Sequence, residues 1–108
     1  MFNLFKSSNL NQDQAYAELS QDKSIKLIDV RTRLEFSEGH IPHSVNIPLD
    51  TLESRLAKSL PNKDAKIFVV CYSGARAKTA VSELKKVGYT QVFNIGGVST
   101  WKHEMTKK

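Results

Sequence analysis

Apolar residues along the chain fall into short continuous runs separated by stretches with helical spacing. The continuous runs predict four strands, at residues 27–30, 45–47, 67–70 and 92–95. The run Ile67-Phe-Val-Val70 is rich in β-branched residues and apolar at every position. Such a run is typical of a strand at the centre of a parallel sheet that is covered on both faces.

The stretches between these runs predict helices. Asn11 is expected to cap a helix over residues 11–21, and Asp50-Thr-Leu-Glu53 has the spacing of a capping box that opens a second helix. After Gly74, apolar residues recur at i, i+3, i+4 and i+7, which predicts a third helix that ends near Gly88. A single helical turn is expected at 35–38, and a short final helix is expected through Trp101.

Because strands and helices alternate, the fold class predicted is α/β, with a mainly parallel central sheet and helices on both faces. The 108 residues are expected to form a single domain over 1–108, and no repeat or linker interrupts them. The composition, 40% hydrophobic and 25% charged, is that of a soluble globular protein.

Charge and residue counts exclude several function classes. The net charge of +5 is spread along the chain, which favours a basic surface that attracts small anions over a nucleic-acid site. The chain has one cysteine, Cys71, so neither an internal disulfide nor a Cys-rich metal site is expected. The apolar start over residues 1–5 is too short for a secretory signal or a membrane span. We therefore expect a cytoplasmic protein without metal, organic cofactor or membrane partner.

Cys71 is the strongest candidate for chemistry. It follows the most central predicted strand and precedes a helix, and ligands of open α/β sheets bind beyond the carboxyl ends of strands. A tight turn before a helix aims backbone N–H groups at one point and adds a partial charge of roughly +0.5. With Arg76 nearby, the thiol is expected to ionise readily and to act as a nucleophile. The alternative is that Cys71 is a small apolar core residue.

Cys71-Tyr-Ser-Gly-Ala-Arg76 resembles the active-site loop of the rhodanese family. Upstream, Leu27-Ile-Asp-Val-Arg31, Glu35-Phe36, Gly39-His-Ile-Pro42 and Asn46-Ile-Pro48 match the family in order and spacing, and downstream Gly96-Gly97 with Trp101 does so too. The resemblance covers residues 27–101. The pair His43-Ser44 departs from it, because the family usually has a small pair such as Gly-Ala at that turn.

The resemblance implies a central parallel sheet of about five strands and a single-domain thiosulfate sulfurtransferase. It implies that Cys71 accepts sulfur as a persulfide and that the backbone amides of Tyr72, Ser73, Gly74, Ala75 and Arg76 hold the transferred sulfur. Arg76 would also bind an anionic donor such as thiosulfate. Asp29 and Arg31 would support the loop through polar contacts. The first strand of such a sheet would lie within residues 6–9.

The implied reaction has two steps, in which Cys71 takes the outer sulfur of thiosulfate or of a persulfide donor and passes it to cyanide or a thiol. A monomer is expected, with a sulfur-acceptor protein as a further partner. One alternative is a persulfide relay or docking module of the same fold. Another is a phosphatase or arsenate reductase, which the spacing Cys-x4-Arg disfavours because those enzymes use a loop one residue longer around an oxyanion.

Overall fold

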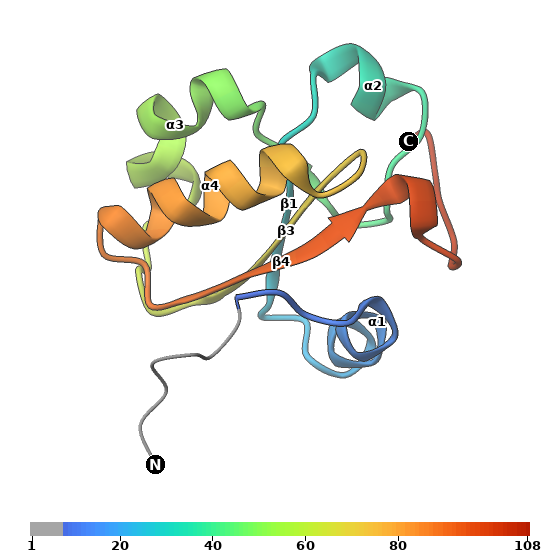
Figure 1. Ribbon diagram of the computed structural model, residues 1–108, viewed down its shortest axis with the longest axis horizontal. Helices are drawn as coiled ribbons and strands as arrows, with labels where there is room; N and C mark the ends of the chain where they lie inside the picture. The colour runs from blue at the N-terminus through green and yellow to red at the C-terminus, as the bar shows by residue number, and fades with distance from the viewer. Residues whose placement is uncertain (1–7) are drawn as a thin grey trace.

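The computed structural model describes residues 8–108. They form a central sheet with helices packed on it (Figure 1). The elements in chain order are α1 Gln12–Gln21, β1 Lys26–Asp29, α2 Arg33–Ser37, β2 Val45–Asn46, the 3₁₀ turn η1 Leu49–Thr51, α3 Leu52–Ser59, β3 Lys66–Cys71, α4 Ala75–Lys86, β4 Gln91–Gly97 and the 3₁₀ turn η2 Val98–Thr100.

The described strands form one parallel sheet in the order β2-β1-β3-β4. Strand β3 therefore lies between β1 and β4, as its continuous apolar run predicted. Because the strands are parallel, their carboxyl ends meet at one edge of the sheet, and Cys71 is the last residue of β3 at that edge.

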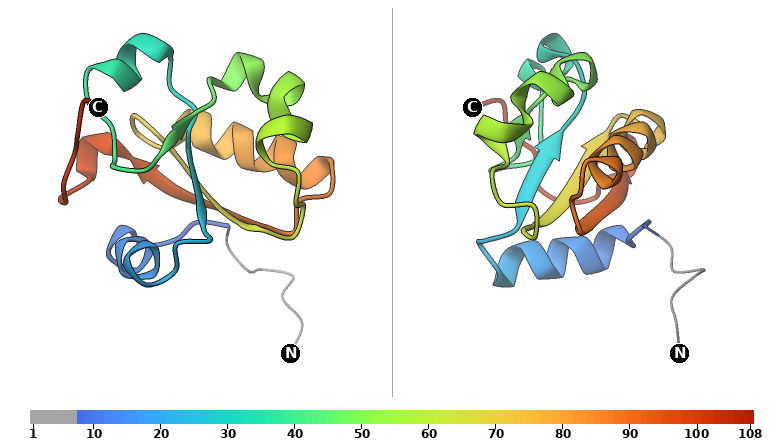
Figure 2. Two further views of the ribbon diagram at one scale, coloured as in Figure 1. Left: turned by 180° about the vertical axis from the view of Figure 1, so that it is seen from behind. Right: turned by 90° about the vertical axis from the view of Figure 1, so that its left-hand side faces the viewer.

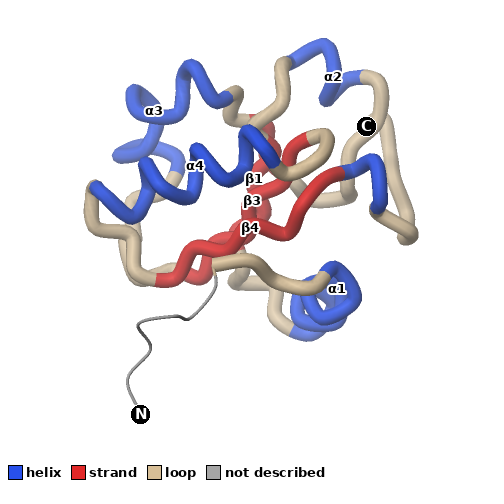
Figure 3. Tube along the Cα trace, viewed as in Figure 1, coloured by secondary structure: helices blue, strands red, loops and turns tan. Residues whose placement is uncertain are grey.

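Helices cover both faces of the sheet, which confirms the predicted α/β class (Figures 2 and 3). Side chains of a strand alternate between the two faces. Ile67, Val69 and Cys71 pack with residues of α3 and α4, whereas Phe68 and Val70 pack with residues of α1 and with Trp101. Strand β3 is thus packed between two apolar clusters, one on each face of the sheet, and Cys71 lies at its end.

The expectation of about five strands is corrected to four among residues 8–108. A parallel bridge joins Asn9 to Asn94 of β4, at the outer side of that strand. The Leu10 amide donates to the Asn94 carbonyl, and the Asn94 amide donates to the Ser8 carbonyl. This contact lies where the missing strand was expected, but it extends over too few residues for a strand. Lys6 and Ser7, which belong to that expected segment, lie outside the described residues.

Two helix starts differ from the prediction. Asp50 and Glu53 form no capping box, because residues 49–51 make a 3₁₀ turn and α3 begins at Leu52 without a side-chain cap. A capping box that was not predicted opens α2, where Thr32 and Glu35 each bind the other's backbone amide. The helical turn expected at 35–38 therefore starts earlier, at Arg33.

The pair His43-Ser44, which departs from the family pattern, lies in a turn with a strained backbone. His43 adopts a φ of 70°, in the left-handed region that favours glycine. This is the position at which the resembled family usually has a small residue. Across the described chain no helix is long and apolar enough to cross a membrane.

Candidate active site

Cys71 lies at the carboxyl end of β3 with its side chain almost fully buried, at 1% exposure. It belongs to the apolar cluster on the α3 and α4 face, so part of the alternative reading, a core environment, is correct. The sulfur nevertheless has a polar partner: the Gly74 amide donates a hydrogen bond to Sγ over 2.9 Å. An ordinary core cysteine would not need a turn folded back on its sulfur.

Gly74 makes this turn feasible. Its φ of 106° lies in the left-handed region, and it is the N-cap residue of α4. The amide of an N-cap residue has no acceptor within the helix, and here the sulfur of Cys71 is its acceptor. The first turn of α4 contains no acidic residue, so nothing on that turn offsets the positive end of the helix dipole.

The remaining loop residues surround this turn. Tyr72 and Ser73 have exposed side chains, Ala75 is exposed as well, and Arg76 is half-buried. Ala75 and Arg76 are the first two residues of α4, whose amides have no acceptor inside the helix. Of these loop residues, Gly74 is the one whose amide hydrogen bond to Sγ the structure records. Binding of a transferred sulfur by the other loop amides stays a prediction.

Gly97 lets the end of β4 approach the loop. A Cβ atom at this position would lie 1.8 Å from the carbonyl oxygen of Tyr72 and 2.5 Å from the Cα of Ser73. The Tyr72 carbonyl also accepts a hydrogen bond from the Ser99 amide over 3.0 Å. The missing side chain of Gly97 thus permits a tight loop beside the cysteine.

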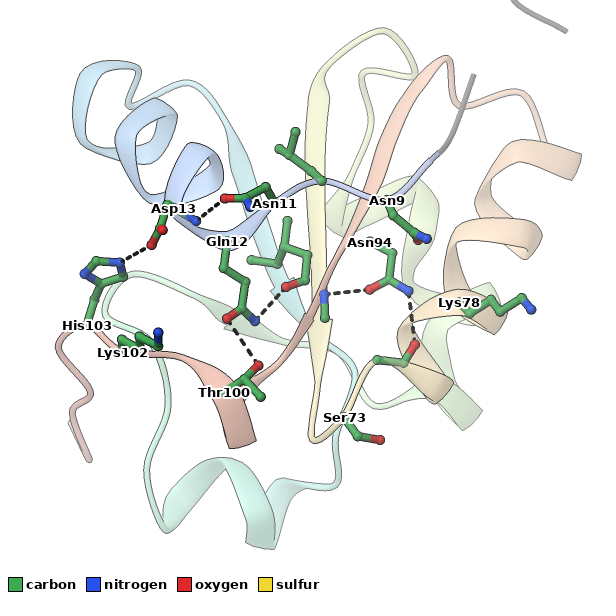
Figure 4. A pocket seen from close by; sticks show the side chains of 14 residues that line it. Asn9, Asn11, Gln12, Asp13, Ser73, Lys78, Asn94, Thr100, Lys102 and His103 are labelled. Atoms are coloured by element: carbon green, nitrogen blue, oxygen red, sulfur yellow. Dashed lines mark hydrogen bonds and ion pairs between the residues drawn. The ribbon is translucent and has the colours of Figure 1, made fainter. Parts of the chain in front are cut away.

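Asn94 also reaches the loop, and sequence reasoning missed it (Figure 4). Its Nδ2 donates to the Gly74 carbonyl over 3.0 Å, and its Oδ1 accepts from the Gly96 amide over 2.8 Å. A polar residue inside the predicted strand 92–95 was the available signal, because its side chain has to find partners when the strand is covered.

Arg76 makes an ion pair with Glu35 of α2. Nη1 lies 2.7 Å from Oε1 and Nη2 lies 3.0 Å from Oε2, a forked geometry in which both oxygens are used. The hydrogen bonds from Arg76 lower the pKa of Glu35 to about 2, against a smaller opposing effect of burial. In the sequence, Glu35 stands out only as a position that matches the family, and its pairing with Arg76 was not predicted. The spacing Thr32-x-x-Glu35 was the signal that this carboxylate is held in place.

Asp29 and Arg31 form a buried pair next to this ion pair. Arg31 donates from Nε and Nη2 to the carboxylate of Asp29 at 2.8–3.0 Å, and Nη2 also donates to the Gly39 carbonyl over 2.7 Å. The Asn46 side chain donates to the backbone carbonyls of both residues. Among residues 8–108 these recorded side-chain bonds tie β1 to the α2 and β2 segments and do not reach residues 71–76. Support of the loop by Asp29 and Arg31 stays a prediction.

The turn at Gly39, which accepts the Arg31 bond, is held by local contacts. His40 is buried, its Nδ1 lies 2.8 Å from the Phe36 carbonyl, and its ring stacks on that of Phe36. Its backbone pairs with Thr106 in an antiparallel bridge. In the part of the chain that the structure describes, no group of three or more His, Cys, Asp or Glu residues could hold a metal ion.

A polar cavity of about 750 Å³ adjoins the loop on the side of β4 and the start of α1 (Figure 4). Ser73 and Gly74 line it from the loop, and Lys78 and Lys102 bring positive charge to it. A second cavity, of about 500 Å³, contains Arg76. Residues of the loop thus line both cavities, Ser73 and Gly74 the first and Arg76 the second.

Comparison with known proteins places this chain in a family. The family model described as Rhodanese-like domain matches residues 11–104. A protein named Sulfurtransferase from Allochromatium vinosum is 32% identical over 102 residues, which cover 94% of this chain and 89% of that protein. The adenylyltransferase and sulfurtransferase uba4 of Ogataea parapolymorpha is 35% identical over 89 residues, which cover 82% of this chain. The match is only 23% of that longer protein.

The fold is also found in solved structures. The rhodanese-like domain protein from Staphylococcus aureus superimposes with a TM-score of 0.81 and is 31% identical, with 93% of this chain and 97% of that chain covered.

Proposed function

The chain belongs to the rhodanese-like domain family, and we propose that it transfers sulfane sulfur through a persulfide on Cys71. Relatives at this level of similarity carry the name sulfurtransferase, which supports sulfur transfer in general. The observation that carries the proposal is the 2.9 Å hydrogen bond from the Gly74 amide to the Cys71 sulfur, at the N-terminus of α4. The same donor that meets the thiol would meet the anionic sulfur that replaces it.

With thiosulfate as the donor, the Cys71 thiolate attacks its outer sulfur in the first step. A new S–S bond forms to Cys71, and the bond between the two donor sulfurs breaks with its electron pair, so that sulfite leaves. Charge is conserved, because a thiolate and a thiosulfate dianion become a persulfide anion and a sulfite dianion. The chain's contribution is a nucleophile already oriented by Gly74.

In the second step an acceptor attacks the terminal sulfur of the persulfide and regenerates the thiolate. Cyanide would yield thiocyanate, and a cellular thiolate would yield a new persulfide. The loop amides of Tyr72 to Arg76 would stabilise the persulfide between the two steps. This would require the amides of Ala75 and Arg76, which have no acceptor within α4, to face the terminal sulfur.

Mass spectrometry of the full chain after thiosulfate treatment tests the first step. We expect the gain of one sulfur atom on Cys71 and its loss when cyanide is added, with thiocyanate formed in equal amount. The variant Cys71→Ser should neither gain sulfur nor form thiocyanate. Sulfur transfer at the wild-type rate in that variant would overturn the proposal.

The same measurement distinguishes an enzyme that turns over small acceptors from a persulfide relay that passes sulfur to another protein. If Cys71 gains sulfur but cyanide and small thiols remove it slowly, the chain is a persulfide relay whose acceptor is another protein. If Cys71 gains no sulfur from any donor, the family member acts as a docking module. Steady thiocyanate production through many turnovers supports the enzyme.

A further inference from the structure

The ion pair between Arg76 and Glu35 affects how an anionic sulfur donor can bind to Arg76. The resemblance assigns Arg76 to the binding of an anionic donor, yet two of its N–H groups are given to a carboxylate of this chain. A guanidinium has five N–H groups in a planar fork, and a forked pair uses its two parallel ones. An anionic donor at Arg76 meets either the remaining N–H groups or the competing carboxylate.

Glu35 is held firmly in that position. Its Oε1 accepts hydrogen bonds from the Thr32 amide over 3.0 Å and from the Thr32 hydroxyl over 3.1 Å, besides that from Arg76. The backbone of Glu35 is held in turn by the Thr32 hydroxyl, as part of the capping box of α2. Four hydrogen bonds from two parts of the chain thus hold this carboxylate beside Arg76.

The surroundings of Arg76 add further negative charge. The cavity of about 500 Å³ that Arg76 lines is also lined by Asp50, Glu53 and Glu83, and no other basic residue lines it. With Glu35 in place, the positive charge of Arg76 is balanced before any donor binds. On this side of the loop a donor with two negative charges is repelled more than a donor with one, because Coulomb energy scales with the charge of the donor.

We infer that Glu35 is a positioning residue that sets donor specificity through Arg76, so that the site favours donors with at most one negative charge over dianionic thiosulfate. Such donors carry their sulfane sulfur on an organic group, as thiosulfonates and organic persulfides do. The inference rests on the proposed function and narrows its donor class. For a thiosulfonate the balance is simple: the thiolate takes the outer sulfur and a sulfinate leaves with the electron pair of the broken S–S bond.

The test compares two donors that differ in charge, thiosulfate and methanethiosulfonate, with cyanide as the acceptor. Glu35→Gln removes the charge but keeps an amide oxygen for Thr32 and Arg76, and glutamine also serves in a capping box. For a donor charge about 7 Å from the lost carboxylate, Coulomb's law in water gives a gain of about threefold per unit of donor charge. We therefore expect kcat/KM to rise about threefold for methanethiosulfonate and about tenfold for thiosulfate, mainly through KM.

Two controls separate this effect from a structural one. Glu53→Gln removes a carboxylate from the same cavity that makes no recorded contact with Arg76, and it should change the ratio of the two kcat/KM values less than Glu35→Gln does. Raising the ionic strength to about 1 M, where charges are screened within about 3 Å, should erase the gain in Glu35→Gln.

The outcomes separate this inference from the function on which it rests. Sulfur transfer by the wild type with an equal change for both donors in Glu35→Gln would overturn the inference alone, because a structural effect does not depend on donor charge. A shift of the ratio by Glu53→Gln as large as that by Glu35→Gln would overturn it too. A wild-type chain that takes sulfur from neither donor would overturn the proposed function and this inference with it.

Discussion

The side-chain amide of Asn94 donates a 3.0 Å hydrogen bond to the carbonyl oxygen of Gly74, and so joins β4 to the N-cap of α4. Gly74 is also the residue whose amide meets the Cys71 sulfur. The Lys78 amide, in the first full turn of α4, donates to the same carbonyl. Gly74 is thus held from the strand, from the helix and from the cysteine, which defines the shape of the loop.

Replacing Asn94 by Asp should weaken this hold without changing the size of the side chain. The carboxylate still accepts from the Gly96 amide but has no N–H for the Gly74 carbonyl, and it places negative charge near the Cys71 thiolate. The loss of one such bond costs about 1–1.5 kcal/mol, and we expect alkylation of Cys71 by iodoacetamide at pH 7 to slow by about tenfold. The readout is the alkylation rate at pH 7.

Asn62→Asp is the matched control, because Asn62 only accepts a bond from the Asp64 amide in a turn, and aspartate accepts it equally well. It should leave the alkylation rate unchanged. An Asn94→Asp variant that is alkylated at the wild-type rate would contradict a role for this bond at the cysteine.

Gly97→Ala should disturb the loop by direct contact. Its Cβ would lie 1.8 Å from the Tyr72 carbonyl oxygen, so the loop or β4 has to shift. Overpacking of this kind costs about 1–3 kcal/mol, and we expect a lower urea midpoint together with a loss of sulfur loading on Cys71. Urea denaturation and mass spectrometry measure the two effects.

Gly88→Ala is the control variant, because it should lower the stability without distorting the loop at Cys71. Gly88 has a φ of 104°, so alanine is strained there at a cost of about 1–2 kcal/mol, but the new Cβ meets only the Lys63 side chain. This variant should be less stable and still load sulfur. Equal loading by both variants would mean that the approach of Gly97 does not matter to the site.

The ion pair between Glu35 and Arg76 should give the stability a pH dependence. The pKa of Glu35 is lowered from 4.5 to about 2, chiefly by the hydrogen bonds from Arg76. A lowered pKa contributes stability that is complete above about pH 4.5 and is lost as the pH falls towards 2. Because the side chains are 32% and 36% exposed, solvent reduces this contribution to about 1 kcal/mol.

The corresponding measurement is urea denaturation of the wild type and of Glu35→Gln between pH 2 and pH 7. The wild type should be the more stable at pH 7, and the difference should disappear at the acidic end. A difference that stays constant over this range would show that the ion pair contributes nothing through its charge.

Tyr89→Phe should destabilise the core away from the site. The buried Tyr89 hydroxyl donates to the Leu60 carbonyl over 2.5 Å, and the variant would leave that carbonyl without its partner. The expected cost is about 1–3 kcal/mol in the free energy of unfolding, measured by thermal denaturation. Tyr16→Phe is the control, because Tyr16 is partly exposed and its ring contacts with Trp101 and His103 need no hydroxyl. Equal midpoints for the two variants would contradict the importance of the buried bond.

Much of the architecture could be predicted because it depends on contacts that are close in sequence. The apolar run 67–70 shows that this strand is covered on both faces, and the spacing of Ala77, Ala80, Val81 and Leu84 predicts α4 with its buried side. The turn at Gly74 follows from its position between a strand and a helix. The prediction failed at Asp50, where Pro48 precedes a 3₁₀ turn and the expected cap is not made.

The sequence by itself determined the alternation of strands and helices, the family, and the placement of one cysteine between a central strand and a helix. Those features are local, since periodicity and turn geometry act over a few residues. Only the tertiary structure decided that Glu35 neutralises Arg76, that Asn94 holds Gly74, and that Gly97 packs on Tyr72. Each of these pairs joins residues 20 or more positions apart. Such contacts form where parallel strands end at a common edge, and no local pattern specifies which side chains meet there.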